Sequence, residues 1–94
     1  MAYLDTADGR LVWGTASGAP HDPDWFRNLR MARTAEIEVG ARRTTVVPRE
    51  LVGAERDAAW ETILAQRPGV ARYARKAGRP IPVALLAPGG TIAP

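Results

Sequence analysis

Residues 14–29 have the sequence GTASGAPHDPDWFRNL, in which a glycine turn leads directly into a strongly marked helix start. Asp22 precedes Pro23, a pattern typical of a helix N-cap followed by proline at the first helical position. Such a helix directs unpaired N–H groups toward the turn at residues 16–18, and a terminus of this kind attracts anions. From these residues alone, a capped helix after a loop is preferred to a ligand-binding cradle.

The composition indicates one small folded domain. The chain has 94 residues, of which 46% are hydrophobic and 24% charged, values ordinary for a globular protein. It has no cysteine and one histidine, which excludes disulfides and thiolate catalysis and argues against a protein-only metal site. We therefore expect a single domain over residues 1–94, with residues 88–94 as a loose tail, no metal and a cytoplasmic location.

Charge and hydropathy limit the kinds of partner that the chain is expected to bind. The longest apolar run, residues 83–88, is far too short to span a bilayer, and the N-terminus lacks the pattern of a signal peptide. The net charge is +3, and no acid follows Glu61. A basic cluster within thirteen residues consists of Arg67, Arg72, Arg75, Lys76 and Arg79. We interpret this cluster as a solvated face rather than a site.

The first half of the chain predicts two hairpins separated by a helix. Apolar residues on either side of Asp8-Gly9 predict two paired strands within residues 2–17. From Pro23, the apolar spacing predicts an amphipathic helix of about three turns. Residues 35–39 alternate between apolar and charged, and residues 43–51 are their predicted antiparallel partner. Because Pro48 lacks an N–H, it predicts an edge position or a bulge in that strand.

The second half predicts two helices and a closing strand. Gly53 is a predicted N-cap for a helix over residues 54–66, and Arg67-Pro68-Gly69 ends that helix. A shorter helix follows over residues 70–77, ended by Gly78 in the left-handed conformation. The apolar run at residues 83–87 predicts a strand buried on both faces. Together these elements indicate an α+β fold whose mainly antiparallel sheet curls toward a barrel.

Several motifs, in this order and at these distances, resemble those of the deazaflavin-dependent nitroreductase family. The first three are Ser17-Gly18-Ala19-Pro20, Pro23-Asp24-Trp25-Phe26-Arg27-Asn28-Leu29 and Glu36-Ile37-Glu38-Val39-Gly40. Further matches are Gly53-Ala54-Glu55-Arg56, Trp60, Pro68-Gly69, Tyr73 and Arg79-Pro80-Ile81-Pro82-Val83. The resemblance covers nearly the whole chain, and its specificity comes from the agreement of several spaced motifs rather than from any one of them.

The resemblance implies a fold and a chemistry. Members of this family are split β-barrels, similar to the FMN-binding split-barrel fold, with flanking helices. They bind the deazaflavin coenzyme F420, so F420 is the expected cofactor and FMN is less favoured. The implied activity is that of an oxidoreductase, with hydride transfer from reduced F420 to a small-molecule acceptor such as a nitroaromatic, a quinone or an enone. In such chemistry the protein supplies placement, electrostatics and exclusion of water.

The resemblance also assigns residues. The predicted cofactor-binding residues are Gly14, Thr15, Ala16, Ser17, Asp24, Trp25, Phe26, Arg27 and Asn28. The turn is one residue shorter than the family pattern, so Thr15, Ala16 and Ser17 all remain candidates for the family's serine position. Tyr3 and Tyr73 fall where the family has tyrosines that line the substrate side, and they are the predicted catalytic residues. Arg67 and Val70 occupy two neighbouring tyrosine positions of the family.

One departure concerns the start of the chain. Family members carry a Gly-Arg-x-(Ser/Thr)-Gly-x-Pro-Arg motif before the equivalent of Tyr3, and its cations hold the cofactor's phosphate and acidic tail. This chain begins at Met1, after that motif, so we expect a barrel that is incomplete at the N-terminus. An unpaired barrel edge favours a homodimer. Two alternatives stay open: a cofactor-free relative that acts as an interaction domain, and a small basic nucleic-acid-binding module, which we consider the less favoured because no groove-reading helix is evident.

Overall fold

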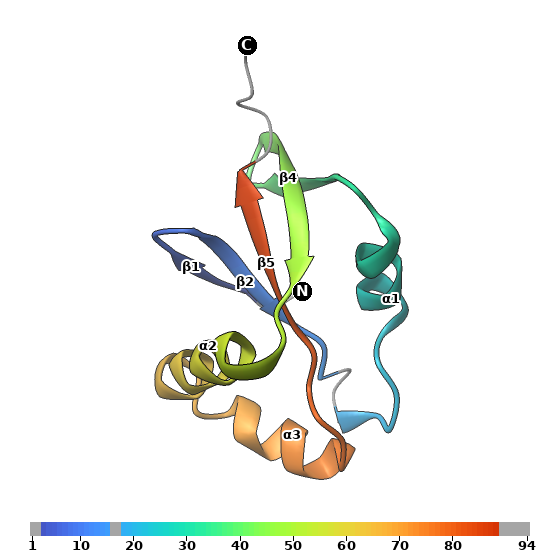
Figure 1. Cartoon of the computed structure of the whole chain (residues 1–94), viewed down its shortest axis with the longest axis vertical. Coiled ribbons are helices and arrows are strands. Elements are labelled where there is room, and N and C mark those ends of the chain that lie inside the picture. Colours follow the sequence, from blue (N-terminus) through green and yellow to red (C-terminus); the bar gives the residue numbers. More distant parts are fainter. Residues whose placement is uncertain (1–2, 16–17, 89–94) are drawn as a thin grey trace.

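The computed structural model describes residues 3–15 and 18–88 and contains five strands and three helices (Figure 1). The elements follow one another in the predicted order, and the α+β fold class is confirmed. Of the predicted tail, only Pro88 lies within the described residues. The elements are β1 Tyr3–Thr6, β2 Gly9–Trp13, α1 Asp24–Met31, β3 Ala35–Val39, β4 Arg42–Glu50, α2 Gly53–Gln66, α3 Val70–Ala77 and β5 Val83–Pro88.

The last strand of the chain lies at the centre of the sheet. The strand order is β1-β2-β5-β4-β3, and every neighbouring pair is antiparallel. Ala84 of β5 is paired with Val12 of β2 on one side and with Glu50 of β4 on the other. β1 and β3 are therefore the outer strands, and the β1-β2 hairpin extends away from the rest of the sheet (Figure 1).

Each face of the sheet carries its own hydrophobic cluster. On one face, Val83 packs with buried residues of β2 and with Ile63 of α2 and Ala77 of α3. On the other face, Ala84 and Leu86 pack with Phe26 of α1. Successive side chains of a strand point to opposite faces, so the continuous apolar sequence of β5 supplies both clusters. The prediction that this strand is buried on both faces is confirmed.

Pro48 lies on an inner strand, so the prediction of an edge strand is wrong. The register between β4 and β5 is continuous from Val46 to Glu50, which also excludes a bulge there. The N–H of Leu51 donates to the oxygen of Val83 at 2.9 Å. Because N–H groups alternate in direction along a strand, the nitrogen of Pro48 faces away from β5. On that side β3 pairs only as far as Val46, so the missing donor breaks no ladder.

The helix starts differ from the prediction in one informative way. The residue that caps α1 is Pro23, with no side-chain hydrogen bond, so the predicted N-cap role of Asp22 is wrong. The carboxylate of Asp22 is engaged by two guanidinium groups instead, as described below. α1 has eight residues, or roughly two turns rather than three. α2 begins at Gly53 itself, and Gly78 ends α3 in the left-handed conformation as predicted, with φ of 65°.

Candidate functional site

The segment between β2 and α1, of which residues 14–15 and 18–23 are described, is called the strap here. It begins beside the chain that enters β5, because the N–H of Gly14 donates to the oxygen of Pro82 at 3.1 Å. Farther along, the N–H of Gly18 donates to the oxygen of Thr15 at 2.9 Å. The strap thus runs across the ends of two central strands, next to the C-terminus of α3 (Figure 1).

A single guanidinium group holds the strap. Arg79, two residues after the end of α3, has a side chain that is only 14% exposed, and it contacts five oxygen atoms of the strap. A guanidinium has five N–H donors in a rigid fork, so one side chain can serve several acceptors at once. The acceptors are the carbonyl oxygens of Ala19 (3.1 Å from Nε), Gly14 (3.0 Å from Nη2), Thr15 (3.3 Å) and His21 (2.8 Å), and Oδ1 of Asp22 (2.8 Å from Nη1).

Asp22 links this arginine to a second one. Its Oδ2 lies 2.8 Å from Nη2 of Arg30, and Arg30 forms a bidentate pair with Glu50 at 2.7 and 3.0 Å. The hydrogen bonds to Glu50, and then to Asp22, raise the pKa of Arg30 above its ordinary value. The resulting chain of charges joins Arg79, the strap, α1 and the end of β4. Bidentate, charge-assisted bonds of this kind fix the geometry of the strap as well as its position.

The two glycines of the strap are required by packing. A Cβ at Gly14 would lie 2.9 Å from Cδ of Pro23 and 3.3 Å from Cγ of Pro82. Gly18 has φ of +89°, and a Cβ there would lie 2.6 Å from Cδ of Lys76. Glycine therefore lets the strap pack directly against two proline rings and against the alkyl stem of Lys76 in α3.

The predicted cofactor-binding residues fall into three environments. Gly14 is buried and Thr15 half-buried in the strap, whereas Ala16 and Ser17 lie outside the described residues. On α1, Asp24, Arg27 and Asn28 are exposed, and Asp24 is paired with Arg27. Phe26 is fully buried in the core, and the half-buried Trp25 packs against it with ring centroids 5.4 Å apart. Of the α1 aromatics, Trp25 is the one with surface left for a ligand.

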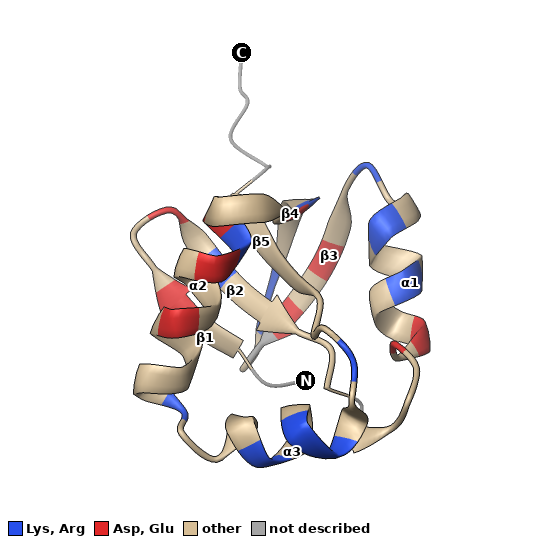
Figure 2. Ribbon diagram, turned by 60° about the horizontal axis from the view of Figure 1, so that its bottom comes forward, with Lys and Arg blue, Asp and Glu red and all other residues tan. Residues whose placement is uncertain are grey.

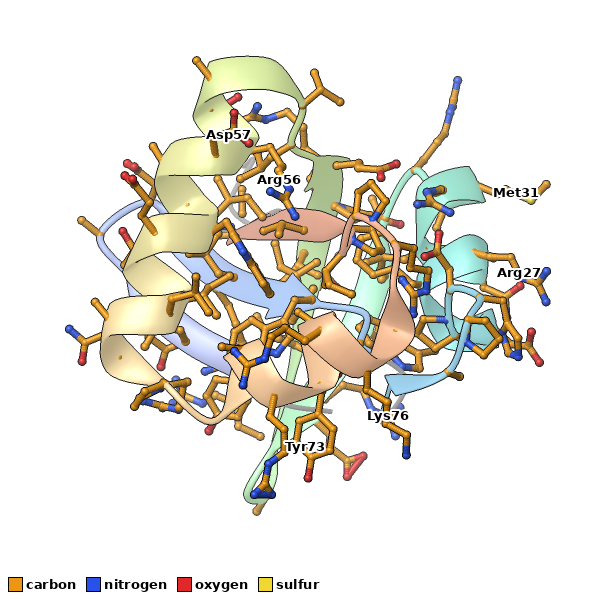
Figure 3. All side chains as sticks on the ribbon, turned by 90° about the horizontal axis from the view of Figure 1, so that it is seen from below. Arg27, Met31, Arg56, Asp57, Tyr73 and Lys76 are labelled. Carbon is orange, nitrogen blue, oxygen red and sulfur yellow. The ribbon has the colours of Figure 1, made fainter. Side chains whose placement is uncertain are left out.

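The two predicted catalytic tyrosines do not share a site within one chain. Tyr3 is paired with Val12, so its side chain lies on the α1 face of the sheet, where the guanidinium of Arg10 stacks 4.1 Å from its ring centroid. Tyr73 is 44% exposed on α3, which packs on the opposite face, and it extends outward from that helix (Figure 3). Only Tyr73 therefore belongs to the α3 side of the sheet, where Lys76 packs on the strap.

Several hollows lie among the described residues. One of about 470 Å³ lies on the α1 face near the ends of the two hairpins and includes Asp5, Arg10 and Thr44 in its lining. A second, about 200 Å³, is lined in part by the charged chain at Asp22, Arg30 and Glu50. A third, about 130 Å³, lies between α1 and β4. The residues that line these hollows were not predicted as site residues from the sequence, although the period-two alternation of β1 and β2 already places Asp5 and Arg10 on one face.

Charge on the surface is unevenly distributed. In Figure 2, α3 carries blue residues and no red, whereas α1 and α2 carry both signs. The prediction of a solvated basic face holds for Arg72, Arg75 and Lys76, which are exposed. It is wrong for Arg79, whose side chain is mostly covered and binds the strap. Within residues 3–15 and 18–88, no group of three potential metal ligands comes together, and no helix is long and apolar enough to cross a membrane.

The fold and the site define a class of protein. The chain is an α+β protein of the split-barrel type, with an open antiparallel sheet and a glycine strap fixed beside a cationic helix. Residues 1–88 match the family model described as F420H(2)-dependent quinone reductase. The chain belongs to this family, which confirms the resemblance to F420-dependent reductases seen in the sequence motifs.

Individual relatives agree with this assignment. F420H(2)-dependent quinone reductases of Mycobacterium tuberculosis, from strains H37Rv and CDC 1551, are 28% identical over 89 residues, covering 92% of this chain. The chain spans 60% of the length of these curated relatives. Two solved structures each have a TM-score of 0.78 at 25% identity over 92% of this chain. One is an F420-H2 dependent reductase (FDR-A), 76% covered, and the other is a domain-swapped dimer, 65% covered.

Proposed function

We propose that this chain binds coenzyme F420 and takes part in hydride transfer from its reduced form to a quinone. The observation that supports the proposal most strongly is the set of hydrogen bonds from the Arg79 guanidinium to the strap. These bonds fix the segment to which the family resemblance assigns the cofactor ring. A largely covered guanidinium serving four backbone carbonyls keeps that backbone in one conformation before any ligand arrives, and preorganisation of this kind lowers the cost of binding.

The residues present fit such a cofactor. F420 combines a flat, largely apolar ring with an anionic phosphate and acidic tail. The half-buried Trp25, two residues after the strap in sequence, has an aromatic surface suited to the ring, and α3 supplies positive charge beside Gly18. The donor set is therefore cationic and aromatic, and it contains no metal-binding group among the described residues.

The roles of the protein's own residues follow from this arrangement. When bound, reduced F420 supplies the hydride. Arg79 holds the strap in place. The apolar cluster around Phe26 and Trp25 packs α1 firmly against the sheet and keeps water from the inner surface of that helix. Reduction of a quinone also requires a proton at the acceptor oxygen, and we propose that the hydroxyl Oη of Tyr73 donates it. Nitroaromatic and enone acceptors remain further candidates under the same chemistry.

We also propose that the protein forms a homodimer through an outer strand of its sheet. β1 and β3 each have one strand partner within the described residues, so each presents an edge for pairing. The similarity to a chain that was solved as a domain-swapped dimer supports the proposal. Sedimentation analysis of the wild-type chain and of a Leu4→Pro variant of β1 tests it. The wild type is expected to sediment as a dimer and the variant as a monomer, whereas a monomeric wild type excludes the dimer.

The proposed function is tested by titration. Adding the chain to oxidised F420 is expected to change the fluorescence of the deazaflavin in a saturable manner. Adding the chain to reduced F420 and a soluble benzoquinone is expected to accelerate oxidation of the cofactor. Tyr73→Phe is expected to slow that oxidation while leaving the fluorescence titration unchanged. A chain that leaves F420 fluorescence unaltered at all concentrations contradicts the proposal.

A further inference from the structure

The two outer strands of the sheet differ in how well they can pair with a second copy of the chain. A two-fold axis pairs a strand with itself in antiparallel fashion, and side chains opposed across that pair lie on the same face. In β3, the face away from α1 carries Glu36 and Glu38, and both lie beside a single cation, Arg43, at 3.8 and 3.7 Å or less. Every register that overlaps three or more residues of β3 sets glutamate opposite glutamate, which is destabilising. The edge of β3 is thus protected against self-pairing.

The hydrogen-bonding directions along β1 identify the residues whose backbone groups face outward. The N–H of Gly14, directly after β2, donates to the chain that enters β5. Backbone groups alternate in direction along a strand, so those of Leu11, three positions earlier, point toward β1. Leu11 is the partner of Leu4, and the backbone groups of Leu4 are therefore used within the hairpin. Those of Tyr3 and Asp5 point the other way, to the outer edge of the sheet.

One register of β1 with itself satisfies both the backbone and the side chains. A two-fold axis at Leu4 sets Leu4 opposite its copy and Tyr3 opposite Asp5 of the second copy. Each of the two Tyr3–Asp5 pairs can then exchange both of its N–H···O bonds, because these are the outward-facing groups. An axis at Asp5 sets two carboxylates in opposition and Leu4 opposite Thr6. An axis at Tyr3 or Thr6 leaves a single residue of β1 in the overlap.

Side chains complement one another on both faces in this register. On the α2 face, Leu4 packs with the core cluster and lies in one row with its strand partner Leu11, so an apolar row crosses the axis. On the α1 face, Arg10 pairs with Asp5 and stacks 4.1 Å from the ring centroid of Tyr3. The ring of Tyr3 is 40% exposed in the single chain, and a neighbouring strand would cover part of that surface.

We propose that two copies of this chain pair through β1 about a two-fold axis at Leu4, which joins their sheets into one continuous antiparallel sheet. This inference rests on the proposed homodimer, and it goes further because it names the edge, the register and the contacts. Pairing of this kind also covers the free β1 edge of both copies. It requires no exchange of segments between them, because each copy keeps its own hairpin.

Cysteine cross-linking tests the register, because the chain has no cysteine of its own. Leu4→Cys places two thiols across the axis, with Cα atoms about 4.5 Å apart, a distance that a disulfide spans. Asp5→Cys is the matched control on the same strand, because its two thiols lie on a diagonal, about 7 to 8 Å apart. Glu38→Cys reports on pairing through β3. Covalent dimer is measured on non-reducing gels after mild oxidation, and circular dichroism checks the fold of each variant.

The expected result is specific to one position. Leu4→Cys forms covalent dimer at least about tenfold faster than Asp5→Cys or Glu38→Cys. A mixture of Tyr3→Cys and Asp5→Cys chains cross-links faster than either variant alone, because these residues are opposed only between copies. Tyr3→Pro removes an outward N–H and is expected to sediment as a monomer with an intact fold. Leu4→Pro also removes a donor of the hairpin, so Tyr3→Pro isolates the contribution of the edge.

The possible failures are distinguishable. A wild type that sediments as a monomer at all concentrations removes the homodimer and this inference together, and leaves the proposal on F420 untouched. A dimeric wild type whose Leu4→Cys variant does not cross-link overturns the register while the homodimer stands. Faster cross-linking of Asp5→Cys moves the axis to that residue, and faster cross-linking of Glu38→Cys assigns the interface to β3. Either of these results overturns the inference.

Discussion

Arg79 and Asp22 form an ion pair in which Nη1 lies 2.8 Å from Oδ1, with the side chains 14% and 22% exposed. The pair joins the second residue after α3 to the second residue before α1, across 57 positions of sequence. Because Asp22 also binds Arg30, and Arg30 binds Glu50, this contact ties together four separate parts of the chain. It is the most connected polar contact of the site.

Loss of Arg79 is predicted to damage both the fold and the site. Arg79→Ala leaves four strap carbonyls without their donor and Asp22 with one partner, so the free energy of unfolding falls by about 2 to 4 kcal/mol. Arg79→Lys restores the charge but not the fork of donors, and it recovers less than half of that loss. Urea denaturation measures both variants. A lysine variant as stable as the wild type would show that charge alone holds the strap.

The strap is predicted to be intolerant of a side chain at Gly18. Gly18→Ala combines a φ of +89° with a Cβ that collides with Lys76, so a loss of about 1 to 3 kcal/mol is expected. Gly69 is the matched control, because it has φ of −64° and open space around a Cβ. Gly69→Ala is expected to change stability by less than about 1 kcal/mol. Equal thermal midpoints for the two variants would contradict the packing described for the strap.

The packing of α1 against the sheet is predicted to depend on the aromatic ring of Phe26. Phe26 is fully buried on the α1 face, so Phe26→Ala should lower the free energy of unfolding by about 3 to 5 kcal/mol. Met31, on the same helix, is 86% exposed, and Met31→Ala should stay within about 0.5 kcal/mol of the wild type. Figure 3 shows Met31 extending away from the ribbon. Similar losses for the two variants would mean that α1 is not docked through Phe26.

Acid is predicted to weaken the junction between β4 and α2. The bidentate hydrogen bond from Arg49 lowers the pKa of Glu55 below its ordinary value of 4.5. A lowered folded-state pKa contributes stability that is present above the unfolded pKa and is lost as pH falls through the folded pKa. The thermal midpoint of the wild type should therefore exceed that of Glu55→Gln at pH 7, and the difference should disappear as the pH falls below 4.5 toward 2. A difference that persists at pH 2 would exclude this ion pair as its cause.

Much of the fold could be predicted because its signals are local. The alternation in residues 35–39, the Asp8-Gly9 turn and the left-handed Gly78 each specify structure within a few residues, and the corresponding elements are observed within one or two positions. The central place of β5 was indicated by its continuous apolar sequence. Its particular neighbours, β2 and β4, depend on chain crossings that periodicity does not encode.

The errors have a common physical origin. Asp22 has the local pattern of an N-cap, but two guanidinium groups from distant positions compete for its oxygens more strongly than a backbone N–H. Arg79 was grouped with exposed cations because its acceptors lie 57 to 65 positions away. Pro48 was assigned to an edge because the sequence does not show where β3 ends relative to β4. Non-local partners decided all three cases.

The most direct test of the account is a map of amide chemical shifts during titration of the chain with F420. The largest changes are predicted to fall on Gly14, Thr15 and Gly18 of the strap. Few changes are expected around Asp5, Arg10 and Thr44, which line the hollow of about 470 Å³ near the ends of the two hairpins. Changes concentrated at that hollow, or no changes at saturating F420, would contradict the assignment of the cofactor ring to the strap.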